Sequence, residues 1–372
     1  MKTNGSTHTV AEVINDMNAR GIRVLSFASV LVLAGCGSPI ARSNHGLTAK
    51  KTASVRHNRT SSSFTKTGAK GGGTAGSAKL TVLGYWAHHK ALPVSSLSAS
   101  GHSISYLAPF WYALTASGSI KNKMDPALLS EARKLHMAII PLVSDATGHQ
   151  AFLSSKATRK MAVQSIDHLI ATMHYQGVDI DFEPPHTAMK AVLTAFMIQL
   201  RDSLPHTDHI IMDVVPHSGG AYAYTKLAPE VTAFQLMSYD EHSAGTPSGP
   251  VAAMNWVSSV ASRLKKVVPP SKIYLGVALY GYSWAPGSTH AVTIPYDAIT
   301  PAMKAKATWN TRYQEMTADI GGKVFWWENR KGIAQKIAFA KKNHLAGIAL
   351  WQVGYANSAI YHELLTNIGK QP

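Results

Sequence analysis

Cysteine and acidic residues are scarce in this sequence. Its 372 residues include one cysteine, and 20 acidic side chains stand against 36 basic ones. A single cysteine excludes an intramolecular disulfide framework, a cysteine-based zinc finger and an iron–sulfur cluster. The sequence also lacks H-E-x-x-H, P-loop and G-x-S-x-G motifs, so zinc proteolysis, phosphoryl transfer and serine hydrolysis have no recognisable site. We therefore expect no metal and no cofactor, and the net charge of +16 suggests a polyanionic neighbour.

The apolar run at residues 24–34 is too short for a transmembrane helix, which needs about 20 residues. It leads directly into Leu33-Ala34-Gly35-Cys36, which resembles the bacterial lipobox, where the cysteine is lipidated and becomes the mature N-terminus. We interpret residues 1–36 as a lipoprotein signal peptide ending at Cys36, with Met17 as an alternative start. A buried strand with an incidental cysteine is the competing interpretation. The signal predicts a membrane partner through an N-terminal lipid anchor, at the extracellular face of the bacterial cell membrane.

Residues 37–78 consist mainly of serine, threonine, glycine, alanine and basic residues. The segment holds seven basic residues and no acidic one. Such a composition cannot bury enough apolar surface to offset the entropy of ordering. We predict a disordered basic linker, which is either a tether that also touches anionic polymer or a plain spacer.

From residue 79 to the end, apolar runs alternate with amphipathic segments. The candidate strands are 80–86, 103–110, 137–143, 177–183, 209–215, 233–239, 273–281 and 346–351, and the candidate helices include 126–136, 158–175, 187–204, 251–267 and 332–343. Eight nearly all-apolar strands with intervening helices predict an α/β fold, a (β/α)8 TIM barrel over residues 79–372. A doubly wound open sheet is the alternative, but no G-x-G-x-x-G follows the first strand. The long interval before the last strand predicts a small α+β insertion at about 283–331, between strands seven and eight.

Three acidic residues alternate with apolar ones in the fourth predicted strand. Asp179, Asp181 and Glu183 should all point into the barrel, because side chains along a strand alternate between its two faces. Like charges in such a place raise one another's pKa, so stability alone would not select them. Glu183 comes last, at the end of the strand where barrel enzymes place catalytic groups. Buried structural salt bridges are the alternative interpretation.

The segment Gln176–Glu183 (QGVDIDFE) resembles the D-G-x-D-x-D-x-E signature of glycoside hydrolase family 18, the chitinase family. Four further segments resemble the family in the expected order: 237–240 (MSYD), 276–281 (GVALYG), 324–329 (VFWWEN) and 347–351 (GIALW). The likeness extends from Leu80 to the C-terminus. Within the family it is greatest to the spore-germination, cortex-lytic N-acetylglucosaminidase branch. Gln176 departs from the signature, since it replaces the first aspartate.

The resemblance implies retaining, substrate-assisted cleavage, in which the 2-acetamido group of the substrate attacks the anomeric carbon. It implies that Glu183 is the acid and then the base, while Asp181 orients the acetamido group. Asp179 would share a proton with Asp181, and Tyr239 would hydrogen-bond the acetamido oxygen. The candidate substrate-binding residues are Asp240, Trp351, Tyr85, Tyr280 and Met237; for the last three, simple packing is the competing interpretation.

Three functions are compatible with these features. The first is a cell-surface glycosidase that cleaves β-1,4 bonds next to N-acetylglucosamine in peptidoglycan or chitin-like polysaccharide. The second is a non-catalytic glycan-binding lipoprotein, against which the intact acidic residues argue. The third, nucleic-acid binding, would need aromatic residues among the basic ones of the linker, where Phe64 stands alone. We therefore predict the first, acting as a monomer with no nucleic-acid partner.

Overall fold

The computed structural model describes residues 80–87, 93–100, 103–183, 187–217 and 220–356, together with 360–362, 364 and 366. The predicted signal peptide, the lipidation site Cys36 and the basic linker lie outside the described residues. Among those that are described, no helix is both long enough and apolar enough to cross a membrane.

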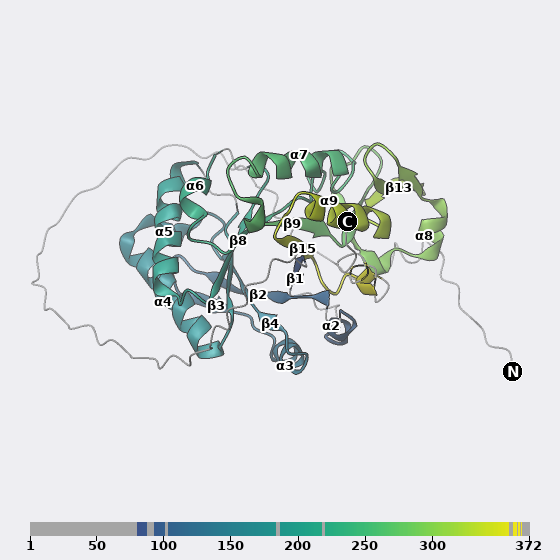
Figure 1. Ribbon diagram of the computed structural model, residues 1–372. Coiled ribbons are helices and arrows are strands. Elements are labelled where there is room, and N and C mark those ends of the chain that lie inside the picture. Colours follow the sequence, from purple (N-terminus) through teal and green to yellow (C-terminus); the bar gives the residue numbers. More distant parts are fainter. Residues whose placement is uncertain are drawn as a thin grey trace, which may run out of the picture. The chain divides into compact units, whose positions relative to one another are not determined.

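Parallel strands close into an eight-stranded barrel (Figure 1), which confirms the predicted (β/α)8 fold. Closure is seen at β1, which pairs in parallel with both the last strand and the second one. The barrel strands are β1 (Thr81–Trp86), β2 (Tyr106–Leu114), β4 (Ala138–Ile139) with β5 (Leu142–Asp145), β6 (Gly177–Asp181), β7 (His209–Val214), β8 (Ala233–Leu236), β9 (Ile273–Ala278) and β15 (Gly347–Trp351). A short strand, β3 (Ile120–Asn122), extends β2 as an antiparallel hairpin.

The core has two layers because the strands are apolar on both faces. Inside the barrel, a small cluster includes Leu83, Ile211 and Ala349, contributed by β1, β7 and β15. A much larger cluster fills the space between the strands and the surrounding helices. This arrangement explains why the strands are continuous apolar runs, and it makes any inward-facing polar residue conspicuous.

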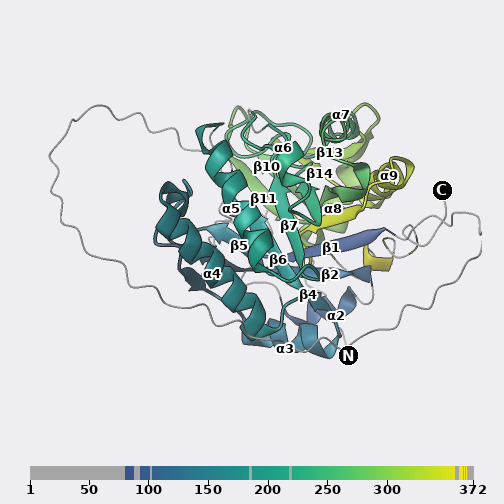
Figure 2. The same ribbon diagram turned by 60° about the vertical axis from the view of Figure 1, so that its left-hand side comes forward.

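Helices cover the outside of the barrel, and α4 and α5 lie side by side on one flank (Figure 2). Asp125 caps α3 by accepting hydrogen bonds from the N–H groups of Ala127 and Leu128, with Pro126 in the first turn, as the sequence predicts. The helices are α2 (Ser95–Ala99), α3 (Pro126–Lys134), α4 (Lys156–Met173), α5 (Lys190–Ser203), α6 (Tyr224–Leu227), α7 (Met254–Leu264) and α9 (Arg330–Lys342), with 3-10 turns at Ala151–Ser154, Thr187–Met189, Pro270–Lys272 and Tyr296–Ala298.

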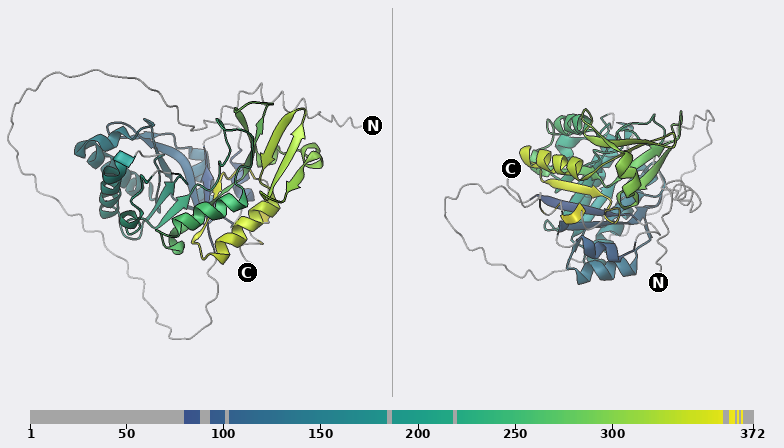
Figure 3. Two further views of the ribbon diagram at one scale, coloured as in Figure 1. Left: turned by 90° about the horizontal axis from the view of Figure 1, so that it is seen from above. Right: turned by 90° about the vertical axis from the view of Figure 1, so that its right-hand side faces the viewer.

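An antiparallel sheet is inserted between β9 and β15 (Figure 3). It contains β10 (Tyr280–Trp284), β11 (Ala291–Pro295), β12 (Thr308–Asn310), β13 (Glu315–Ile320) and β14 (Lys323–Trp327), with the helix α8 (Pro301–Lys306). The sequence predicts that Tyr280 belongs to barrel strand seven and that the insertion starts near 283. The structure instead places Tyr280 in β10, opposite Pro295 of β11, because the chain leaves the barrel at Leu279.

The third strand position is interrupted, whereas the sequence predicts a continuous strand over 137–143. Pro141 separates β4 from β5 and has no N–H to donate to a neighbouring strand. Its carbonyl still accepts a hydrogen bond from the N–H of Asp179, at 3.0 Å. Despite the interruption, β6, which carries the acidic residues, therefore stays hydrogen-bonded to the neighbouring strand.

Candidate active site

The three acidic residues of the signature lie along β6 and the residues that follow it. Asp179 is fully buried, while Asp181 and Glu183 are partly exposed. Asp179 and Asp181 pair with Leu142 and Ser144 of β5, so their strand is fixed in register on that side. The row thus runs from the barrel interior towards the C-terminal ends of the strands, where Glu183 lies.

Burial raises the pKa of each acidic residue in this row. The pKa of Asp179 rises to about 7, mainly through loss of solvent, and that of Asp181 rises to about 7 through burial and the charge of Asp179. Burial, together with the charges of Asp181 and Asp240, raises the pKa of Glu183 to about 8. A carboxyl group with such a pKa can hold a proton at neutral pH and release it to a reacting atom.

Asp213 on β7 is a fourth acidic residue of the cluster, and the sequence analysis missed it. It is buried, its Oδ1 accepts a hydrogen bond from the hydroxyl of Tyr85 at 2.7 Å, and burial and the charge of Asp179 raise its pKa. Asp213 lies two residues after Ile211, which faces the barrel interior, so strand alternation was the signal that could have identified it.

Asp179 and Asp213 interact directly in the interior. Both carboxyl oxygens of Asp179 are buried and have no well-aligned hydrogen-bond partner among the described residues. Tyr85 has one hydroxyl proton, which is directed at Asp213. A proton shared between the two carboxyl groups would satisfy both, since two adjacent ionised carboxylates repel each other.

Tyr239 follows β8 and lies close to the acidic cluster. It is 8% exposed, and its pKa is raised by burial and by the charges of Asp213, Glu183 and other carboxylates. The hydroxyl therefore stays protonated and can donate a hydrogen bond. Gly276 of β9 makes room for the ring, because a Cβ there would lie 2.8 Å from Cε1 of Tyr239.

Aromatic rings form a continuous row from β1 to the inserted sheet. The ring of Trp351 lies 5.3 Å from Tyr85 and 6.5 Å from Tyr239, centre to centre, and is nearly parallel to Tyr239. Tyr239 in turn contacts Tyr280, whose ring meets Tyr282 edge-on at 5.4 Å. Pyranose rings stack on accessible aromatic faces through their C–H groups, and Trp351 is the partly exposed ring of this row, so a sugar could stack on Trp351 while the buried tyrosines support it.

Asp240 is an exposed residue in a left-handed backbone conformation, with φ of 61°. Its Oδ1 accepts hydrogen bonds from the hydroxyls of Tyr280 and Tyr282, at 2.5 and 2.9 Å. Tyr282 was missed by the sequence analysis, although its alternation with Tyr280 along β10 was the available signal. The structure therefore brings Asp240 and Tyr280 together, with Tyr282 as a third member.

Met237 and Gln176, two further positions that the sequence analysis named, make packing and backbone contacts. Met237 is 8% exposed and packs in the large core, as Tyr239 does, and its role in substrate binding stays a prediction. Gln176 lies before β6, and its Oε1 accepts a hydrogen bond from the N–H of Ile139 at 2.6 Å. It therefore links the start of β6 to β4, far along the strand from Glu183.

The backbone of Glu183 is held by a neighbouring loop. Nε2 of Gln150 donates to the carbonyl of Glu183 at 3.0 Å, and the N–H of Gln150 donates to Asp145 at 2.6 Å. The hydroxyl of Thr147 also donates its one proton to the carboxylate of Asp145, with its oxygen 2.7 and 2.9 Å from the two carboxylate oxygens. Glu183 is thus positioned from β5 as well as from its own strand. Within the described part of the chain, no group of three or more histidine, cysteine, aspartate or glutamate side chains is suited to hold a metal ion.

Residues 130–356 match the sequence profile of glycosyl hydrolases family 18. The chain belongs to this family. Its members are glycosidases that act on glycans containing N-acetylglucosamine. The match spans β6 with its acidic residues and ends after Trp351, so it contains Glu183, Tyr239 and Asp240.

Two curated relatives show where the chain lies within the family. It is 28% identical over 276 residues to the protein of Bacillus subtilis named as a sporulation-specific glycosylase, YdhD, covering 67% of this chain and 66% of the relative. It is 23% identical over 292 residues to the cortical fragment-lytic enzyme of Bacillus cereus, covering 70% and 67%. The chain thus spans about two thirds of the length of these relatives.

Solved structures share the fold. The chitinase of Chromobacterium violaceum matches with a TM-score of 0.71 at 21% identity, covering 78% of this chain and 100% of the other. The spore cortex-lytic enzyme SleL of Bacillus megaterium matches with a TM-score of 0.69 at 21% identity, covering 79% and 75%. At this level of identity the likeness establishes the barrel fold alone.

Proposed function

We propose that the chain hydrolyses β-1,4 bonds next to N-acetylglucosamine in peptidoglycan or chitin-like glycans, with retention of configuration and Glu183 as acid and base. The supporting observation is the row Asp179–Asp181–Glu183, in which burial raises the pKa of all three carboxyl groups to about 7 or 8. A protonated carboxyl group next to an ionised one is the arrangement required for acid catalysis at neutral pH.

In the proposed first step, the carbonyl oxygen of the substrate's 2-acetamido group attacks the anomeric carbon. The glycosidic bond breaks, and the leaving oxygen takes the proton of Glu183. Asp181, ionised, would accept a hydrogen bond from the acetamido N–H and stabilise the positive oxazolinium ring. The hydroxyl of Tyr239 would hold the acetamido group in its reactive orientation.

In the second step, water attacks the anomeric carbon and reopens the oxazolinium ring. Glu183, now ionised, takes a proton from that water and returns to its starting state. The proton shared by Asp179 and Asp213 lowers the negative charge near Asp181, so that Asp181 can ionise while Glu183 stays protonated. Trp351 would provide the apolar surface under the sugar, and Asp240 would bind a sugar hydroxyl.

The names of the relatives favour a bacterial wall glycan. One is named a sporulation-specific glycosylase and another a cortical fragment-lytic enzyme, which supports peptidoglycan as the first substrate to test. We further propose that the enzyme works as a monomer, held at the extracellular face of the membrane by lipid on Cys36. The supporting features are the lipobox-like residues 33–36 and a catalytic cluster formed within one chain.

The proposal is tested by incubating the full chain with purified peptidoglycan and with chitin oligomers and identifying the products by mass. We expect the variant Glu183→Gln to lose about a hundredfold to ten-thousandfold in rate, the usual contribution of a general acid. Glu131→Gln, at a surface glutamate that pairs with Lys134, is the matched control and should retain activity. Release of the same products by wild type and Glu183→Gln at similar rates would overturn the proposal.

A further inference from the structure

The end of the barrel opposite Glu183 carries a concentrated basic surface that the proposed reaction does not use. Helices α7 and α9 contact each other and lie side by side (Figures 1 and 3). Barrel helices run antiparallel to the strands, so both helices end where the strands begin. We define the basic face as the residues in and just after their last turns: Arg263, Lys265, Lys266, Lys341, Lys342 and His344.

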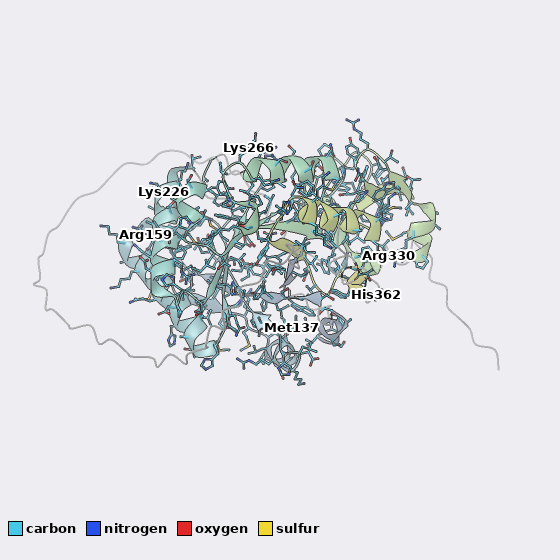
Figure 4. The ribbon with its side chains drawn as sticks, in the orientation of Figure 1. Met137, Arg159, Lys226, Lys266, Arg330 and His362 are labelled. Atoms are coloured by element: carbon cyan, nitrogen blue, oxygen red, sulfur yellow. The ribbon has the colours of Figure 1, made fainter. Side chains whose placement is uncertain are left out.

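Hydrogen bonds hold the two helix ends together. Nζ of Lys265 donates to Oδ1 of Asn343 at 2.7 Å, joining the end of α7 to the end of α9. Arg263, Lys266 and Lys342 are exposed. Figure 4 shows Lys266 beyond the last turn of α7 and Arg330 at the other end of the helix pair. The positive side chains therefore form one surface at a fixed place on the barrel.

The two stretches of chain that contain α7 and α9 have basic residues and lack acidic ones. No acidic residue occurs anywhere in residues 242–296 or in residues 329–362. At the same end, Glu230 interacts with Lys272, whose Nζ also donates to the carbonyls of Ala228 and Val231. Helices α7 and α9 therefore have no acidic side chain of their own that could neutralise the positive charge of the basic face.

The preceding segment of the chain joins the barrel at this face. The N–H of Thr81, at the start of β1, donates to the carbonyl of Ala346, and the N–H of Ala346 donates to the carbonyl of Pro270. Ala346 lies two residues after His344, so β1 starts next to the basic face. The sequence that leads into β1 contains the basic segment 37–78 and, before it, the apolar run 24–34.

We propose that the basic face docks onto the anionic headgroups of a phospholipid bilayer. Each lysine or arginine close to an anionic membrane adds to the attraction, and the positive charges here lie at the ends of two parallel helices. Docking in this orientation directs Glu183 and the aromatic row away from the lipid. The barrel would dock in this orientation whether or not it hydrolyses glycan.

The test compares binding of the full chain to vesicles of phosphatidylcholine alone and to vesicles with about 30% phosphatidylglycerol, by co-sedimentation at low salt. The test variant carries Lys266→Glu and Lys342→Glu. The matched control carries Lys156→Glu and Lys160→Glu, which change the net charge equally on exposed positions of α4, near its start. We expect the test variant to bind anionic vesicles more than roughly 30-fold more weakly than wild type, because loss of two lysines near the surface alone contributes about that factor and the two glutamates add repulsion.

The control variant should keep wild-type binding to anionic vesicles, and binding of each protein to the neutral vesicles is the baseline that is subtracted. Milder changes, Lys266→Gln with Lys342→Gln, should weaken binding by a smaller factor and exclude an effect of misfolding. All variants should hydrolyse a soluble substrate at the wild-type rate, which separates failure of docking from failure of the proposed function. Equal losses in test and control variants would overturn the proposal, as would wild-type binding to poly(glycerol phosphate) without binding to anionic vesicles.

Discussion

At the scale of single residues, Glu183 and Asp179 illustrate how position along one strand separates two roles. Asp179 is fully buried among barrel residues and cannot reach a substrate. Glu183 lies beyond the end of β6, is partly exposed, and still has a pKa raised to about 8. Glu183 has the highest of the three pKa values, lies furthest towards the C-terminal ends of the strands, and so combines a proton at neutral pH with access to a glycosidic oxygen. Asp179 acts on it through Asp181: the charge of Asp179 raises the pKa of Asp181, and the charge of Asp181 raises that of Glu183.

These pKa values predict the pH dependence of hydrolysis. The acid must be protonated, so kcat/KM should fall as the pH rises through about 8, the pKa of Glu183. Asp181 must be ionised to stabilise the oxazolinium ring, so kcat/KM should also fall as the pH drops below about 7. The profile of a soluble N-acetylglucosamine oligomer substrate should therefore be bell-shaped and narrow, with both limbs belonging to the coupled set of carboxyl groups.

The surface variant Glu131→Gln should show the same two limbs as wild type, since Glu131 lies outside the carboxylate cluster. If kcat/KM instead continues to rise above pH 8, Glu183 does not act as the proton donor. The profile can be measured by initial rates in a mixed buffer of constant ionic strength.

The residues of the site differ in how visible they are in the sequence. Asp179, Asp181 and Glu183 share one strand, so alternation along that strand was enough to group them. Asp213 joins them from β7 and Tyr282 from β10, and such groupings depend on strand order and register, which a single sequence leaves open. Asp213 and Tyr282 were missed for this reason, whereas Tyr239, Asp240 and Trp351, which also come from other strands, were named through the resemblance to the family.

At the scale of secondary-structure elements, β9 leaves room for the ring of Tyr239 because the residue that faces it, Gly276, has no side chain. A Cβ on Gly276 would lie 2.5 Å from the carbonyl oxygen of Leu236 and 2.9 Å from Nε2 of Gln235, as well as close to the Tyr239 ring. The contact with Leu236 involves backbone, so a larger residue must push β8 and β9 apart. The site thus depends on close packing between two strands.

The variant Gly276→Ala tests this dependence. We expect kcat to fall by about a hundredfold, because a displacement of roughly 1 Å at a positioning group can cost that much. Gly84→Ala is the matched control: its Cβ would also overpack, against Val353 and Ile104, but away from Tyr239. The control should lose about 1–3 kcal/mol of stability with kcat retained. Similar kcat in both variants would show that Tyr239 is not positioned through Gly276.

The boundaries of elements were less predictable than their order. The apolar runs fixed all eight strand positions, because each run is long and bounded by amphipathic segments. The break at Pro141 and the departure of the chain at Leu279 depend on which hydrogen bonds the neighbouring strands offer, and these appear only after the barrel closes. For the same reason Tyr280, predicted in a barrel strand, belongs to the inserted sheet.

At the scale of the whole molecule, charge is distributed unevenly. Four of the 20 acidic residues, Asp179, Asp181, Glu183 and Asp213, gather around the interior of the barrel. The helices α7 and α9 have none, and their ends form the basic face. A protein with few acidic residues has thus placed a fifth of them in this one cluster, where burial disfavours their charged form. This arrangement should cost stability wherever those groups are forced to ionise.

The variant Asp213→Asn measures that cost. In the folded protein the pKa of Asp213 is raised well above its unfolded value of about 3.9, so the folded state keeps a proton that the unfolded state releases. The resulting stability is fully present below about pH 4 and is lost as the pH rises through the folded pKa values, which lie near 7 for Asp179 and Asp181. Asparagine has no such proton to lose, and its Oδ1 can still accept the Tyr85 hydroxyl.

We therefore expect Asp213→Asn to gain thermal stability relative to wild type on going from pH 5 to pH 8, by about 3 °C in the unfolding midpoint. Circular dichroism melts at the two pH values measure this difference, and Asp319→Asn, at an exposed position of β13, is the control that should show no such gain. The same variant should hydrolyse substrate more slowly, because Asp213 interacts with Asp179 and Asp181, and the charge of Asp181 raises the pKa of Glu183. A variant equally destabilised at both pH values would mean that Asp213 serves packing alone, and that the carboxylate cluster is not electrostatically coupled.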